Sequence, residues 1–215
     1  MVINKRSQNN LQDKKILITA GPTWVAIDRV RVISNIASGE TGILLAERLN
    51  AIGAKVTLIL GPAGPCHSDK KIKVIRFRFF DELRQRIRKE LKSQSYDFII
   101  HSAAVSDFKP QTTVKGKLGS DRIHNLKLTA LPKIVNDIKR LAPLARLVLF
   151  KLEVGVSDQK LINRARQALG CGLRDLAVAN TIEPHYKAYL IDKNRIYSKA
   201  GSREELAGQL IAVLS

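Results

Sequence analysis

Acidic residues, cysteines and aromatic side chains are all scarce in this chain of 215 residues. It has 19 Asp and Glu residues against 37 Lys and Arg residues, a formal net charge of +18, and an aromatic content of 5%. The two cysteines, Cys66 and Cys171, lie far apart and form no C-x-x-C pair. This argues against a disulfide framework or a cysteine zinc site and favours a reducing, cytoplasmic location. No metal-ligand spacing links the cysteines to His101, which follows an apolar run and is interpreted as a packed histidine.

Long apolar stretches are also missing. No run approaches the roughly 20 residues that a membrane-spanning helix needs, and the first 14 residues lack the apolar core of a signal peptide. Hydrophobic residues still make up 45% of the chain, enough for a buried core. We interpret residues 1–13 as a polar tail and residues 14–215 as a single domain, in which 108–125 form a flap.

The positive charge raises the question of nucleic-acid binding. The basic residues are spread along the whole chain, without an arginine-rich arm or a basic stripe interleaved with aromatic residues. A solvated basic surface accounts for most of this charge, and nucleic acid is an unlikely partner. A non-catalytic nucleotide- or nucleic-acid-binding protein stays open as an alternative.

Hydrophobic periodicity predicts strands alternating with helices. The pattern is typical of an α/β fold with a doubly wound, mostly parallel, Rossmann-like sheet and helices on both faces. We expect a C-terminal hairpin and a last helix capped at Ser202. Strands are predicted at 16–20, 55–60, 72–77, 96–105, 126–131, 146–152 and 175–179, helices at 43–51, 81–92, 132–141 and 157–169, and the hairpin at 188–192 and 195–198.

The segment 15–42 combines a strand, a glycine turn, a polar loop and the start of a helix. This is how α/β proteins build an anion site, because the free N–H groups of the first helical turn and the helix dipole both favour negative charge. Gly39 and Gly42 would let a ligand approach the backbone. Gly21 and Gly39 are too far apart for the G-x-G-x-x-G dinucleotide motif. We therefore expect a phosphate-bearing ligand.

Further polar residues follow apolar strands and should meet at the carboxyl edge of the sheet, where such folds bind ligands. They are Gly21, Ser106 with Asp107, Lys151 with Glu153, and Asn180.

In this order, the motifs resemble those of the phosphopantothenate–cysteine ligase (phosphopantothenoylcysteine synthetase) family of coenzyme A biosynthesis. They are AGPTWVAIDRVRVISNIASGETG, HSAAVSDF, KGKLGS, LPKIV, LFKLE and LAVANT, and they span the chain from about Lys14. The resemblance implies a ligase in its free-standing form, without the decarboxylase domain. The carboxylate of 4′-phosphopantothenate would attack the α-phosphate of a nucleoside triphosphate, giving an acyl-nucleotide and pyrophosphate. The amine of L-cysteine would then form the amide and release the nucleoside monophosphate, with Mg²⁺ on the phosphates.

The resemblance also implies roles for individual residues. Asn35 would be the catalytic asparagine and could donate to an acyl oxygen, Lys117 would supply charge from the flap, and Arg31 would bind a carboxylate or phosphate. The metal ligands are left unassigned. The residues expected to contact the nucleotide are Gly39, Gly42, Ala103, Asp107, Phe150 and Asn180.

Some positions depart from the family pattern. Ala37 replaces one of two serines, Glu40 places a carboxylate near the phosphates, and the lysines expected near Ala168 and Gly172 are absent. The choice between CTP and ATP therefore stays open. The resemblance implies a homodimer in which one subunit's flap can complete the other's site, and we expect the flap alone to be mobile. An NAD(P)-dependent short-chain-type reductase is an alternative, although the Tyr-x-x-x-Lys pair it needs is missing near a suitable strand end.

Overall fold

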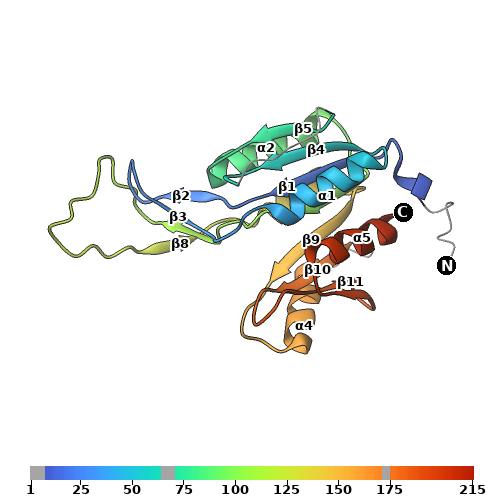
Figure 1. Cartoon of the computed structure of the whole chain (residues 1–215). Helices are drawn as coiled ribbons and strands as arrows, with labels where there is room; N and C mark the ends of the chain where they lie inside the picture. Colours follow the sequence, from blue (N-terminus) through green and yellow to red (C-terminus); the bar gives the residue numbers. More distant parts are fainter. Residues whose placement is uncertain (1–7, 64–70, 171–174) are drawn as a thin grey trace.

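The computed structural model describes residues 8–63, 71–170 and 175–215. An eight-stranded sheet in the order β12-β11-β10-β9-β6-β1-β4-β5 forms its centre, with β10, β9, β6, β1, β4 and β5 parallel and β11 and β12 antiparallel (Figure 1). The predicted fold class is confirmed. The strands are β1 (Lys15–Ala20), β4 (Lys55–Leu60), β5 (Lys73–Arg76), β6 (Phe98–His101), β9 (Arg146–Leu152), β10 (Leu176–Thr181), β11 (Lys187–Ile191) and β12 (Ile196–Ala200).

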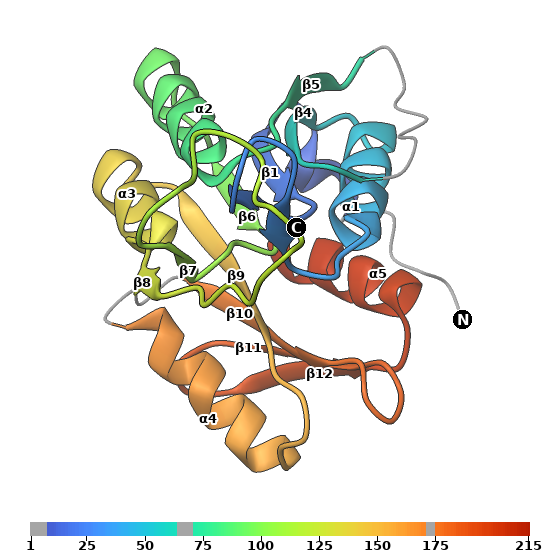
Figure 2. The same cartoon turned by 90° about the vertical axis from the view of Figure 1, so that its left-hand side faces the viewer.

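Helices cover both faces of this sheet (Figure 2). Because side chains alternate along a strand, Ile16 and Ile18 of β1 pack with the helices of one face, whereas Leu17 packs on the other. We call these the α1 face, covered by α1 and α5, and the α2 face, covered by α2, α3 and α4. The helices are α1 (Glu40–Ala51), α2 (Phe80–Ser93), α3 (Ile134–Leu141), α4 (Asp158–Leu169) and α5 (Arg203–Leu214), preceded by the short 3-10 helix η1 (Gln8–Leu11).

Helix ends follow the expected signals. Ser157 and Ser202 cap α4 and α5 by accepting hydrogen bonds from backbone N–H groups of the first turn. Leu11 lies within the segment interpreted as a tail, but it is fully buried in the core of the α1 face. Packing onto the domain therefore begins before residue 14. No helix among the described residues has the length and apolar character to cross a membrane.

Two small antiparallel ribbons stand outside the main sheet. They pair β2 (Trp24–Ala26) with β3 (Val32–Ser34), and β7 (Phe108–Pro110) with β8 (Leu128–Ala130). Figure 1 shows them projecting from the body of the molecule together with the loop between β7 and β8. We call residues 24–36 and 108–130 the arm.

The arm is where the sequence and the structure differ most. The segment between Gly21 and Gly39 was interpreted as a polar loop, but it contains the β2–β3 hairpin.

The strand expected at 96–105 ends at His101. After it the chain stays beside the glycine turn, where Ala104 N donates to Gly21 O at 3.0 Å and Thr23 N donates to Ala104 O at 3.2 Å. These long-range contacts leave no local sequence signal.

Candidate active site

The glycine turn after β1 is built from three backbones in close contact. Gly21 has φ 80° and Gly39 has φ 78°, a left-handed conformation that favours glycine. A Cβ at Gly39 would lie 3.1 Å from the backbone N of Gly21, and a Cβ at Gly21 would lie 3.2 Å from the backbone N of Gly61. Tertiary packing therefore brings together glycines that the sequence spacing kept apart.

Gly42 has a packing role that sequence analysis missed. A Cβ at this position would lie 2.5 Å from the Cβ of Ala20 and 2.8 Å from the Oγ of Ser102. Its missing side chain therefore lets α1 lie close against β1, rather than leaving room for a ligand. A phosphate contact of Gly42 stays a prediction and would use its backbone N–H.

The N-terminus of α1 faces this turn without a side-chain cap. Gly39 is the N-cap residue, and the Glu40 N–H makes a long hydrogen bond of 3.4 Å to Ser38 Oγ. The N–H groups of a first helical turn have no partners within the helix, so this end suits an anion. The carboxylate of Glu40, which sequence analysis flagged as unfavourable, lies 3.6 Å from the Arg203 guanidinium of α5. This ion pair reduces the repulsion between Glu40 and a phosphate.

The side-chain amide of Asn35 is fixed against the loop after β6. Its Nδ2 donates to Ala104 O at 3.1 Å and to Val105 O at 3.2 Å. Both partners are carbonyl oxygens, which only accept hydrogen bonds, so the Nδ2 end of the amide faces them. The expected donation from Asn35 to an acyl oxygen is thus not available in this arrangement, which leaves Oδ1 as an acceptor.

Phe150 and Asn180 lie on neighbouring strands, on the same face as α1. Phe150 pairs in register with Val178, two residues before Asn180, and both Phe150 and Val178 contact the core of the α1 face. The Oδ1 atom of Asn180 is buried and has no hydrogen-bond partner among the described residues. An unsatisfied buried acceptor beside a partly buried aromatic ring suits a ligand with a polar edge and a flat face.

Two of the predicted nucleotide contacts lie elsewhere. Ala103 packs with the α2 face, and its N–H donates to Thr19 Oγ1 at 3.3 Å. Asp107 is exposed and forms an ion pair with Lys133. Lys133 was not singled out in the sequence, although it belongs to the LPKIV motif. Their contacts with a nucleotide stay predictions.

Lys151 and Glu153 meet at the end of β9, as their spacing indicates. Lys151 Nζ lies 3.0 Å from Glu153 Oε1, and Arg164 of α4 binds the other oxygen of this carboxylate. Burial would raise the pKa of Glu153, but the hydrogen bonds from Lys151 and Arg164 outweigh it and lower the pKa. The Glu153 carboxylate is therefore ionised at neutral pH, where it forms ion pairs with Lys151 and Arg164 and does not serve as a proton donor.

Arg31 and Lys117 both belong to the arm, which projects from the body of the molecule (Figure 1). Arg31 Nη1 donates to Asp28 Oδ2 at 2.5 Å and to Leu118 O at 3.2 Å. The flap residues on either side of the exposed Lys117 are hydrogen-bonded to the β2–β3 turn, through Gly116 O and the Leu118 N–H. Within the described residues of a single chain, the Lys117 side chain therefore lies on the arm and not at the glycine turn.

His101 is a packed residue, in line with its sequence interpretation. Its Nδ1 lies 2.8 Å from Thr19 Oγ1, and burial lowers the pKa of the imidazole to about 4. It is therefore neutral at pH 7. No group of three potential metal-ligating side chains occurs in the described ranges, and both Cys66 and Cys171 lie outside them.

These features define a class: an α/β protein with a glycine-rich turn and a helix N-terminus at the carboxyl edge of a mostly parallel sheet. The family model of the DNA/pantothenate metabolism flavoprotein C-terminal domain matches residues 11–210, and the chain belongs to this family. The family match does not favour a short-chain-type reductase or a non-catalytic binding protein.

Individual relatives agree with this assignment. The chain is 37% identical over 196 residues to the coenzyme A biosynthesis bifunctional protein CoaBC of Thermococcus kodakarensis, covering 91% of this chain and 47% of that protein. It is 32% identical over 213 residues to CoaBC of Methanocaldococcus jannaschii, covering 94% and 51%. The chain thus spans about half the length of these curated relatives. The DNA/pantothenate metabolism flavoprotein from Streptococcus pneumoniae has a similar structure, with a TM-score of 0.83, 28% identity and coverage of 94% and 98%.

Proposed function

We propose that this chain is a phosphopantothenate–cysteine ligase, which joins 4′-phosphopantothenate to L-cysteine through an acyl-nucleotide intermediate. The family match over residues 11–210 supports the reaction class. The observation that best supports the site is the uncapped N-terminus of α1 on the same sheet face as Phe150 and Asn180. A triphosphate on the helix end would have its sugar and base near the free Oδ1 of Asn180. We infer a cytoplasmic location from the cysteine content alone.

The nucleotide is CTP or ATP, bound with Mg²⁺. Magnesium is commonly held by substrate phosphates with one or two carboxylates, and it would neutralise charge on the phosphates. Two carboxylates that sequence analysis placed near the nucleotide, Glu40 and Asp107, are each paired with a cation. The described residues therefore suit an ion held chiefly by the nucleotide. Asn180 would contact the base or sugar and could discriminate between the two nucleotides.

Asn35 would act in the second half-reaction. Because its Nδ2 is held by Ala104 O and Val105 O, its Oδ1 would accept a hydrogen bond from the attacking amine of cysteine. This orients the amine toward the acyl carbon without adding charge next to an electron-rich intermediate. Donation to the acyl oxygen, the role expected from the sequence, would require release of the two carbonyls.

We further propose a homodimer formed through the arm. Most of the large apolar residues that are exposed in the described part of the chain lie on it. Exposed apolar residues that gather in one region often mark a protein–protein interface. A partner's arm could then bring its flap lysine to the glycine turn of this chain. The exposed apolar residues of the arm are Val30, Val32, Ile36, Phe108, Val114, Ile123, Leu126 and Leu128.

The reaction is tested by pyrophosphate release and amide formation with 4′-phosphopantothenate, L-cysteine and either CTP or ATP. Pyrophosphate release that depends on phosphopantothenate, followed by amide formation on addition of cysteine, is the expected result. Catalysis by neither nucleotide would refute the proposed function.

The shared site is tested by mixing two inactive variants, Asn35→Asp and Lys117→Gln. If Lys117 acts across the dimer, each mixed dimer has one intact site, and random mixing restores about a quarter of the wild-type activity. If Lys117 acts within its own chain, the mixture stays inactive. Light scattering of the wild type that gives a monomer mass would contradict the dimer itself.

A further inference from the structure

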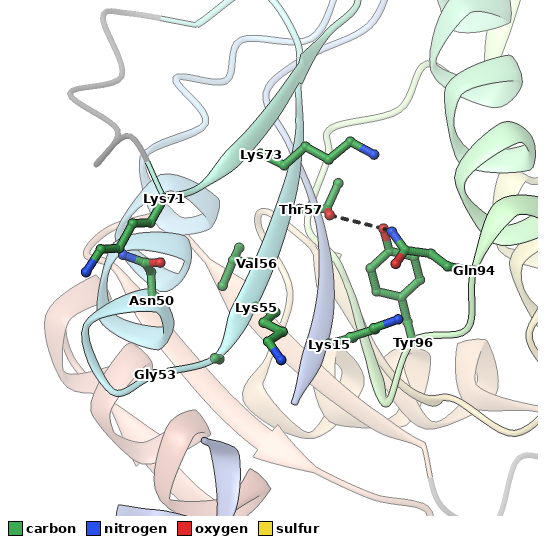
Figure 3. Close-up of a pocket in the computed structure, with 11 residues that line it drawn as sticks. Lys15, Asn50, Gly53, Lys55, Val56, Thr57, Lys71, Lys73, Gln94 and Tyr96 are labelled. Atoms are coloured by element: carbon green, nitrogen blue, oxygen red, sulfur yellow. Dashed lines mark hydrogen bonds between the residues drawn. The ribbon is translucent and has the colours of Figure 1, made fainter. Parts of the chain in front are cut away.

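A basic pocket lies at the end of the sheet opposite the glycine turn, where β1, β4 and β5 begin (Figure 3). Its volume is about 420 Å³, and its lining includes Lys15, Lys55, Lys71 and Lys73. Gly21 follows Lys15 by six residues of nearly continuous strand, roughly 20 Å at about 3.3 Å per residue. One small ligand cannot occupy both this pocket and the glycine turn.

Three of the lysines share one face of three neighbouring strands. Lys15 pairs in register with Lys55, and Thr57 pairs with Lys73. Side chains alternate along a strand, so Lys55 and Thr57, two residues apart, point to the same face. Lys15 lies beside Lys55 and Lys73 lies beside Thr57, so both point to this face as well. Like charges directly opposite each other on neighbouring strands are destabilising, so this arrangement favours a bound anion.

The described acidic groups only partly neutralise these lysines. Lys55 Nζ lies 2.8 Å from Asp13 Oδ1 in a largely exposed pair, and Lys73 Nζ lies 2.8 Å from the buried Glu90. The third lysine of this face, Lys15, has no ion pair within the described ranges. The pocket therefore keeps a surplus positive charge from Lys15, Lys55 and Lys73.

The wall of the pocket is a buried polar network. Tyr96 Oη donates to Glu90 Oε2 at 2.9 Å and lies 3.1 Å from Thr57 Oγ1. Glu90 also accepts from Lys73 through both of its oxygens, at 2.8 and 3.0 Å. Tyr96, Glu90 and Thr57 are each at least 94% buried. The network holds the Lys73 side chain in place. Its ammonium group has three donors, so after the two hydrogen bonds to Glu90 one donor is left for a bound anion.

We propose that this pocket binds a small phosphate-bearing anion, at a site separate from the ligase site. Ammonium groups are point charges well suited to phosphate oxygens. A volume of about 420 Å³ is large enough for a phosphate monoester or a diphosphate. The proposal rests on the pocket alone and does not depend on the proposed function.

The test uses inorganic phosphate and pyrophosphate as probes, with amide NMR spectra of the whole protein. Saturable shifts are expected at the amides of Lys15, Lys55 and Val56, with tighter binding for pyrophosphate because it has more charge. The variant Lys15→Gln/Lys55→Gln should weaken binding at these amides at least tenfold. It should fold, because Lys15 and Lys55 are exposed and, among the residues that the structure describes, the only ion pair removed is the exposed one with Asp13.

A matched control is Lys160→Gln/Lys193→Gln, which removes two exposed lysines from α4 and the β11–β12 turn. This variant should bind as the wild type does. Shifts confined to the region of Gly39 and Gly42, or equal weakening in both double variants, would overturn the proposal. Thermal melts of both variants check the fold.

Discussion

The carboxylate of Asp28 accepts a hydrogen bond from the backbone N–H of Leu118, 90 residues later in the sequence, at 2.9 Å. The same carboxylate accepts from the backbone N–H groups of Val30 and Arg31, each at 2.7 Å. The bond from Leu118 above all holds the pKa of Asp28 well below its usual range, although burial opposes it. The flap, expected to be mobile from its composition, is thereby attached to the β2–β3 turn.

Replacing Asp28 by Asn should release this attachment. The amide keeps the shape but loses the charge, so it accepts these hydrogen bonds more weakly. We expect faster hydrogen exchange at the Leu118 amide and faster trypsin cleavage after Lys117. Asp121→Asn, an exposed change in the same arm, is the control. Equal exchange rates in the wild type and Asp28→Asn would show that the carboxylate does not hold the flap.

The same attachment should depend on pH. Because the pKa of Asp28 is lower in the folded state, its contribution is fully present above the unfolded value of about 3.9 and decreases as the pH falls below it. The protection of the Leu118 amide, corrected for intrinsic exchange, should therefore decrease in acid in the wild type. In Asp28→Asn this loss should be absent. A wild-type protection factor that stays constant down to the acid unfolding of the whole protein would contradict the assignment.

Two glycine-to-alanine changes in helices should have opposite effects. Gly42→Ala places a methyl group 2.5 Å from the Cβ of Ala20 and should lower the free energy of unfolding by about 1–3 kcal/mol. Gly208→Ala, at an exposed position of α5 whose nearest neighbour is 3.9 Å away, should raise it by about 0.5–1 kcal/mol. Denaturant unfolding without any ligand measures both. No loss of stability in Gly42→Ala would mean that α1 can move away from β1 at little cost.

The Asn35→Asp variant should lose amide formation but keep the fold. A carboxylate cannot donate to Ala104 O and Val105 O, and it adds negative charge beside the intermediate. We expect a fall in amide formation of about 100-fold or more. Because Asn35 is exposed, stability should change by less than about 1 kcal/mol. Asn163→Asp on α4 is the control, and product formation is followed by mass spectrometry. Near-normal turnover of Asn35→Asp would refute a catalytic role.

His101 should make the protein less stable in mild acid. Burial lowers its folded-state pKa to about 4, below the unfolded value of about 6.5. The unfolded chain therefore binds more protons between these values, and stability falls as the pH drops from about 6.5 to 4, by on the order of 2 kcal/mol. Denaturant unfolding at several pH values should show this slope in the wild type and a smaller slope in His101→Asn. Identical slopes would show that folding does not lower the pKa of His101.

The sequence by itself was sufficient for the parallel sheet and most of its elements. The strands at 55–60 and 146–152 match β4 and β9 in full, because buried strands need continuous apolar runs that are visible locally. The glycine turn and the cap at Ser202 were equally clear, since each depends on a single residue type with a specific backbone role.

Only the tertiary structure decided what those residues contact. The close packing of Gly42 against Ala20, the engagement of Asn35 with Ala104 and Val105, and the bond between Asp28 and Leu118 join segments far apart in the chain. Such contacts depend on how the strands order themselves in the sheet, and no periodicity within a short window encodes them. Most of the arm escaped sequence analysis for this reason: β2, β3 and β7 are short strands that pair outside the main sheet, and only β8 lies within a segment, 126–131, that was predicted to be a strand.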